Sequence, residues 1–340
     1  MELKSQDTKM IQGLSVLAML CLHLFCKDYN GIFKPIIFIQ NTPLSFYLAQ
    51  LSDFCVMGFA FCSGYGHMAQ HEKNDYYKKS LKRLLVLIVS YWIVVIVFSL
   101  ISSIVGNGSV MPGNAVRFAS NFLTLSNSYN GAWWYLFTYI ILVLLSPFLL
   151  RFINRNHYFI ALGISFCIYC VAFYVRFYLG ASNWILEKFG PFGMTLFEYV
   201  LGVLFFKYKI FTKIYNIWNK VKYNKIWGLF ILCAMLYGRT KVAPNLFFAP
   251  VTGICLIVLF HFWKKPNWVK SFFLLIGKHS TNIWLTHMFF YSVLFVDFIY
   301  IVKYPIAIYI LMLVITLIVS FVLQMIQNPV NAKLKEGMKI

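Results

Sequence analysis

Residues 8–26 read TKMIQGLSVLAMLCLHLFC, an apolar run that also carries Gln12 and His23. Eleven residues make about three turns of an α-helix, so Gln12 and His23 share one face roughly 16 Å apart. Lys9 falls near the same face, just before the apolar run. An ionisable residue inside a membrane is costly and marks function by default. The stretch therefore predicts a membrane helix with one polar face, unless a neighbouring helix simply satisfies the histidine.

The composition of the chain points to a membrane protein. Of its 340 residues, 61% are hydrophobic and only 12% are charged, whereas soluble domains are about half apolar and a quarter charged. Apolar runs of about 20 residues recur along the chain and predict transmembrane helices. We predict an all-α, polytopic membrane bundle of about ten helices that forms one domain over residues 1–340. The predicted spans are 10–26, 45–66, 83–105, 132–150, 157–175, 191–207, 225–238, 245–263, 279–300 and 305–327.

Lysine and arginine are distributed unequally between alternate segments. If the N-terminus is cytoplasmic, the inner segments hold most of these residues, as the positive-inside rule requires. We therefore expect a multi-pass protein of a bacterial-type plasma membrane, with both termini cytoplasmic. The net charge of +20 is then explained by topology and lipid contact rather than by nucleic-acid binding.

Four ionisable residues fall at similar depth within the predicted spans: His23, Asp53, Glu198 and His287. Because such side chains cannot face lipid cheaply, we expect them to line one polar cavity. A carboxylate beside a histidine orients the ring and raises its basicity, which is a common arrangement for a general base. The alternative is that Asp53 and Glu198 only pair with a histidine or with Arg176.

Cations cluster where the third span enters the membrane, in YYKKSLKRLL. Lys79, Lys82 and Arg83, together with Lys278 at the start of the ninth span, are predicted to hold the phosphates of a nucleotide at the inner mouth of the cavity. The alternative is a positive-inside anchor with no ligand. The chain has no P-loop, no G-x-S-x-G and no H-E-x-x-H, which argues against an ATP-driven pump, a serine hydrolase of the usual kind and a zinc protease. We expect no metal and no permanently bound cofactor.

Five stretches, taken in order, resemble the acyltransferase-three family of integral membrane O-acyltransferases. They are the opening helix with its histidine, the Ser-Gly segment FAFCSGYG, the basic YYKKSLKRL, the Trp-Tyr-Leu helix GAWWYLFTYIILVLLSP and the late helix IGKHSTNIWLTHMFF. The likeness covers nearly the whole chain. Three positions depart from the family pattern. Gln12 replaces a basic residue, Ser80 replaces the first of a pair of arginines, and Met57 replaces an acidic residue, although Asp53 lies one turn earlier.

This resemblance implies transfer of an acyl group, usually acetyl from cytoplasmic acetyl-CoA, to an extracytoplasmic carbohydrate. His23 would act as a general base or as the acyl carrier, and Asp53 or Glu198 would orient it. The substrate-contacting residues implied are Gln12, Ser63, Trp134, Tyr135 and His287, and loss of His287 is expected to matter less than loss of His23. Trp134 and Tyr135 are equally explained as interfacial anchors.

Two other classes of protein fit a ten-helix bundle with a polar cavity. One is a transporter or flippase for a lipid-linked glycan, which should show internal repeats or matching broken helices. The other is a membrane scaffold, which gives no reason for the polar face that carries His23. The sequence specifies neither the acceptor nor the oligomeric state.

Overall fold

The computed structural model describes residues 1–27, 31–71, 73, 75–180, 183–239 and 246–337. Apart from one short hairpin, the described elements are helices. In chain order they are α1 (Ser5–Phe25), β1 (Phe38–Ile39), β2 (Thr42–Pro43), α2 (Leu44–Leu51), η1 (Ser52–Phe54), α3 (Cys55–Gln70), α4 (Tyr76–Ile104), α5 (Ala115–Phe122), η2 (Gly131–Trp133), α6 (Trp134–Arg155), α7 (Tyr158–Tyr174), η3 (Val175–Leu179), α8 (Trp184–Lys207), α9 (Ile210–Trp218), α10 (Asn224–Tyr237), η5 (Leu246–Phe248), α11 (Ala249–Phe262), α12 (Asn267–Met288), η6 (Phe289–Val293), α13 (Val296–Tyr300) and α14 (Pro305–Gly337).

The predicted all-α membrane bundle is confirmed. In the described part of the chain, seven helical segments are long and apolar enough to cross a membrane: Ser5–Phe25, Leu44–Gln70, Tyr76–Ile104, Gly131–Arg155, Tyr158–Leu179, Trp184–Lys207 and Pro305–Gly337. Two of the other predicted spans correspond to the shorter apolar helices α10 and α11. The third corresponds to α12, which buries Ser280, Asn282, Thr286 and His287. Such a helix can be polar because its polar side chains face the bundle rather than lipid.

Two predicted spans differ in detail from the observed elements. The span predicted at 45–66 is two α-helices, α2 and α3, joined by the single turn η1 that contains Asp53. The span predicted at 279–300 begins earlier, at Asn267, and its α-helix ends at Met288, where the π-helical turn η6 follows. The exposed lysines Lys270 and Lys278 interrupt the apolar pattern and concealed the true start of this helix. The predicted start of the eighth span, residue 245, lies outside the described residues.

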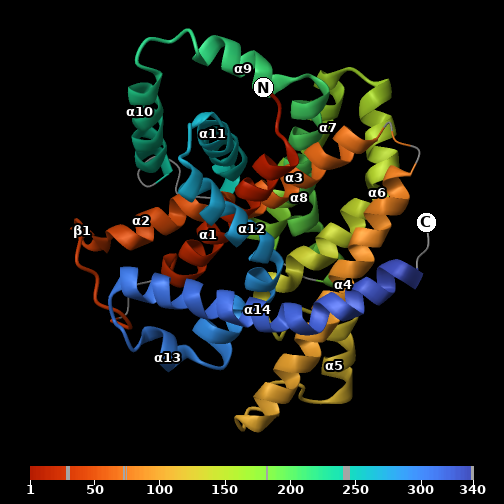
Figure 1. Cartoon of the computed structure of the whole chain (residues 1–340), viewed down its shortest axis with the longest axis vertical. Coiled ribbons are helices and arrows are strands. Elements are labelled where there is room, and N and C mark those ends of the chain that lie inside the picture. Colours follow the sequence, from red (N-terminus) through yellow and green to blue (C-terminus); the bar gives the residue numbers. More distant parts are fainter. Residues whose placement is uncertain (28–30, 72, 74, 181–182, 240–245, 338–340) are drawn as a thin grey trace.

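Helices α1 and α12 pack side by side at the centre of the bundle (Figure 1). Two glycines permit the close approach. A Cβ on Gly13 would lie 2.4 Å from the carbonyl oxygen of Phe273, and one on Gly277 would lie 2.1 Å from that of Lys9. Small residues at helix contacts are typical of membrane bundles, where close packing replaces the hydrophobic driving force. The two glycines therefore fix how α1 and α12 are placed against each other.

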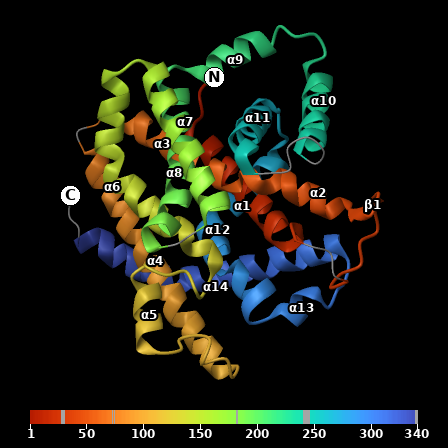
Figure 2. The same cartoon turned by 180° about the vertical axis from the view of Figure 1, so that it is seen from behind.

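A polar contact joins α12 to α14, which crosses α12 and α4 (Figure 1). The side-chain amides of Asn282 and Gln327 bond reciprocally, at 2.9 and 3.0 Å. Gln327 Nε2 also donates to the carbonyl oxygen of Ser90 on α4 at 3.3 Å. Hydrogen bonds of this kind join membrane helices, because an unpaired amide in hydrocarbon is costly. Seen from both sides, the N-terminus lies beside α9, whereas α5 and α13 lie at the opposite end of the molecule (Figure 2).

Candidate active site

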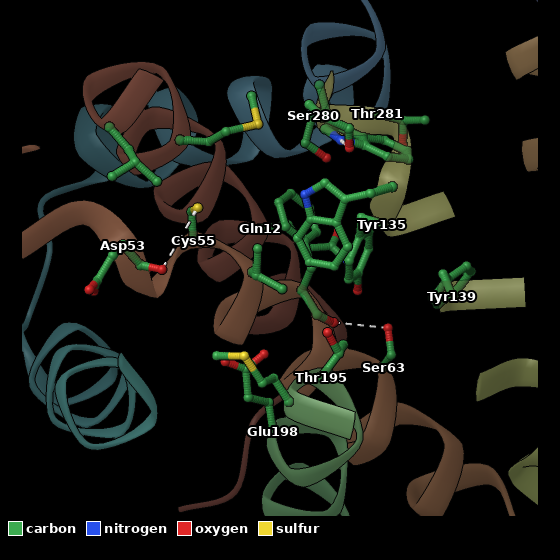
Figure 3. Close-up of a pocket in the computed structure, with 18 of the residues that line it drawn as sticks. Gln12, Asp53, Cys55, Ser63, Tyr135, Tyr139, Thr195, Glu198, Ser280 and Thr281 are labelled. Atoms are coloured by element: carbon green, nitrogen blue, oxygen red, sulfur yellow. Dashed lines mark hydrogen bonds between the residues drawn. The ribbon is translucent and has the colours of Figure 1, made fainter. Parts of the chain in front are cut away.

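A cavity of about 350 Å³ lies inside the bundle, along the polar face of α1. Its walls come from α1, η1, α3, α4, η2, α6, η3, α8, α11 and α12. Figure 3 shows Gln12 near the middle of this cavity, with Asp53 and Tyr139 at opposite sides of the view. Cavities of this size commonly hold small molecules. The polar face predicted for the first helix therefore lines a space large enough for a ligand.

Most of the predicted site residues meet at this cavity. Eight line it: Gln12, His23, Asp53, Ser63, Arg83, Trp134, Tyr135 and Glu198. They come from six elements that are far apart in the sequence. Ser63 donates its hydroxyl hydrogen to the carbonyl oxygen of Phe59 at 2.9 Å, so its lone pairs stay available to a ligand (Figure 3). Helix packing thus brings the predicted polar residues of the spans to one place.

His23 is held by the other predicted histidine, His287. Its Nδ1 lies 2.7 Å from Nε2 of His287, and the two rings stack with centroids 4.9 Å apart. His287 is fully buried, and its Nδ1 lies 2.8 Å from the carbonyl oxygen of Trp284. A carbonyl only accepts, so Nδ1 of His287 carries the hydrogen. When both rings are neutral, Nε2 of His287 accepts from Nδ1 of His23, which leaves a lone pair on Nε2 of His23.

The end of α12 that carries His287 is fixed by the turn η2 and its N-cap Asn130, directly before α6. Asn130 Nδ2 and Trp133 Nε1 each donate to the carbonyl oxygen of Leu285 at 3.0 Å. Trp284 Nε1 donates in return to the carbonyl oxygen of Ala132 at 3.1 Å. The helix then passes into the π-helical turn η6, a feature found frequently at functional sites. These bonds set the position of His287 and, through it, the orientation of His23.

The two carboxylates predicted to orient His23 have other surroundings in the structure. Asp53, 6% exposed, forms an ion pair with Arg239, 5% exposed, through Oδ2 and Nη2. Glu198 is also buried, and within the described residues its Oε2 has no hydrogen-bond partner. No hydrogen bond joins either carboxylate to His23 in the part of the chain that the structure describes. In the structure the hydrogen-bond partner of His23 is His287 and the ion-pair partner of Asp53 is Arg239, and a role of Asp53 or Glu198 toward His23 stays a prediction.

Only one of the four cations predicted to hold phosphates, Arg83, lines the cavity. Lys79 pairs with Asp75 at 2.7 Å, and this hydrogen bond lowers the pKa of the Asp75 carboxyl group. Lys82 donates to the carbonyl oxygen of Lys335 at 3.0 Å. Lys278 is exposed on α12 and is not part of the cavity wall. Lys82 is adjacent to Arg83 in the sequence and therefore points in a different direction on the helix. Lys79 lies one turn before Arg83, nearer the start of α4, where Asp75 holds it.

The structure adds residues to the site that the sequence prediction did not include. Lys9 lines the cavity beside Gln12, to whose Oε1 its Nζ donates at 3.1 Å. Arg176 also lines the cavity, with its guanidinium carbon 5.1 Å from the centre of the Trp134 ring. Arg239 is a third addition, as the ion-pair partner of the cavity residue Asp53. An acidic residue within a predicted span requires a cationic partner, so Asp53 indicates that such a partner exists, but nothing near it in the sequence identifies Arg239.

Comparison with known proteins gives one match. A family model described as an acyltransferase domain matches residues 9–325, nearly the whole chain. No curated protein and no solved structure matches the chain. The matched region includes every residue that lines the cavity.

Proposed function

Because the chain belongs to the acyltransferase-three family, we propose that this membrane acyltransferase moves an acetyl group from cytoplasmic acetyl-CoA to a hydroxyl group of an extracytoplasmic carbohydrate. The acceptor class is a surface polysaccharide of a bacterial-type cell. Both termini are then cytoplasmic, so α1 starts at the donor side and ends at the acceptor side. The observation that supports this proposal best is His23 at the wall of a cavity that follows α1, held by the buried His287, which does not itself line the cavity.

The donor enters along the polar face of α1. Lys9 and Arg83 line the inner part of the cavity and are suited to bind the phosphates of CoA. From Lys9 to His23 the helix rises about 21 Å, at 1.5 Å per residue. An extended pantetheine arm lies along this face and carries the thioester toward His23. Gln12 and Ser63 offer hydrogen-bonding groups on the way.

The transfer step uses His23 as the general base. Its Nε2 takes the proton of the acceptor hydroxyl while the oxygen attacks the carbonyl carbon of the thioester. The carbon–sulfur bond breaks, and the imidazolium of His23 returns the proton to the sulfur, giving CoA as a thiol and the sugar as its acetyl ester. His287 accepts from Nδ1 of His23 throughout, which keeps the basic nitrogen, Nε2, free for the substrate.

The test compares His23 and His287 variants in membranes, with acetyl-CoA labelled in its acetyl group. His23→Gln keeps a polar side chain but cannot take up a proton, so transfer should fall by about a hundred- to ten-thousand-fold. His287→Ala should also lower transfer, because Nδ1 of His23 loses its acceptor. His287→Gln should restore part of it, since its amide oxygen can accept the same hydrogen bond.

The amount of each variant in the membrane is quantified in parallel, and the label transferred to the acceptor glycan is the readout. His287→Gln also serves as the control for loss of structure. A His23→Gln protein that is abundant in the membrane and shows wild-type acetylation would contradict the proposal.

A further inference from the structure

A second cavity of about 250 Å³ adjoins the first. It lies where α6, η3 and α8 begin, which is also the end of the bundle at which α1 finishes. Trp134 and Arg176 line both cavities and therefore form a wall common to the two. Complete small-molecule sites are usually roughly 300–1,000 Å³. The second cavity is smaller than that, so it suits an extension of the first site better than a separate one.

Arg176 stands at the boundary of the two cavities, close enough to Glu198 on the wall of the first cavity to interact with its charge but without a direct ion pair to it. Its guanidinium group lies over the Trp134 ring, and its Nη1 is 3.9 Å from the sulfur of Met194. Among the described residues it forms no ion pair, although the side chain is only partly exposed. A guanidinium group binds carboxylate or phosphate through two parallel hydrogen bonds. Arg176 is thus a cation placed to receive an anionic ligand.

The rest of the second cavity adds no net negative charge. Lys188, 9% exposed, pairs with its neighbour Glu187 at 2.9 Å, so these two charges offset each other. Thr138 and Asn127 add polar side chains to the wall. With Arg176 included, the charge of the cavity is positive, and the Trp134 ring supplies a flat surface against which a sugar ring can pack. The lining therefore favours a sugar that carries an anionic group.

We propose that the second cavity binds an anionic group, carboxylate or phosphate, on the acceptor glycan, with Arg176 as its ligand. This inference rests on the proposed acyl transfer. A neighbouring sugar residue then lies in the first cavity, with a hydroxyl group at His23. Arg176 acts as a specificity-determining residue that selects acidic over neutral acceptors.

The experiment measures binding without turnover. The full chain is purified in detergent, and its thermal unfolding is followed with three probes: methyl glucuronide, glycerol phosphate and methyl glucoside. A ligand that binds only the folded state raises the melting temperature in proportion to its affinity. We expect a shift with the glucuronide or the phosphate and none with the neutral glucoside. A shift with the glucuronide alone identifies the bound group as the carboxylate of an acidic sugar, and a shift with glycerol phosphate alone identifies it as a phosphate.

Four variants test whether Arg176 is the group that binds the anion. Arg176→Gln should weaken anion binding by about tenfold or more, and Arg176→Lys should retain part of it. Arg155→Gln, an exposed arginine at the far end of α6, is the matched control and should bind as wild type. His23→Gln should keep the anion-dependent shift, which separates this proposal from the transfer chemistry. Equal shifts with glucuronide, phosphate and glucoside, or an unchanged shift in Arg176→Gln, would overturn it.

Discussion

Replacing Gly277 by alanine should separate the two histidines without altering either. In the structure, a Cβ at position 277 would lie 2.1 Å from the carbonyl oxygen of Lys9. Ordinary van der Waals contact begins more than about 1 Å further out, and the obstructing atom belongs to the backbone. Helices α1 and α12 must therefore move apart by about that distance. His23 and His287 each follow their packing glycines, Gly13 and Gly277, by ten residues along the same two helices.

A movement of this size breaks the contact between the rings. The nitrogen–nitrogen distance of 2.7 Å would grow to about 3.7 Å, beyond the range of a hydrogen bond. A misplacement of about 1 Å at a catalytic group can cost about a hundredfold in rate, and overpacking costs about 1–3 kcal/mol of stability. We expect Gly277→Ala to lose about a hundredfold of acyl transfer per folded molecule, measured with labelled acetyl-CoA alongside thermal unfolding.

Gly163 on α7 provides the matched control. A Cβ at that position has no heavy atom within 4 Å, so Gly163→Ala should keep both transfer and stability, or gain slightly from higher helix propensity. Gly13→Ala should behave like Gly277→Ala, since its Cβ would lie 2.4 Å from the carbonyl oxygen of Phe273. Wild-type transfer and stability in Gly277→Ala would refute the assigned role of the glycine contact.

Three further predictions concern the donor site, the buried ion pair and the topology. Lys9→Gln and Arg83→Gln should each raise the acetyl-CoA concentration needed for half-maximal transfer, while Lys79→Gln should not; equal effects of all three would show that the cavity cations are only anchors. Asp53→Ala should destabilise the protein by about 3–5 kcal/mol because the buried Arg239 loses the carboxylate of its ion pair. Replacing Asp53 by Leu and Arg239 by Met together should recover much of the lost stability, measured by thermal unfolding. A double variant as unstable as Asp53→Ala would contradict this prediction. A single cysteine at Ser126 should react with an impermeant reagent from outside the cell and one at Lys220 should not, whereas the reverse pattern would invert the orientation.

The sequence by itself determined the class of the protein and the polar face of its first helix. Both depend on local patterns. A run of about 20 apolar residues must form a helix in a bilayer, whatever surrounds it, because its backbone groups find no other partners there. The spacing of Gln12 and His23 places them on one face for the same local reason. The polar residues of several spans were expected to share a cavity, since exposure to lipid is costly, and eight of the predicted site residues do line one.

Tertiary structure alone decided which of these residues touch. His287 is 264 residues from His23, and Arg239 is 186 residues from Asp53. Neither pairing has a local signal, because the relative position and rotation of membrane helices depend on small contacts such as Gly277 against the backbone of Lys9. The same holds for the cations of YYKKSLKRLL, of which only Arg83 reaches the cavity. Hydrophobicity places a side chain at a depth in the membrane, but only the packing of the helices determines its neighbours.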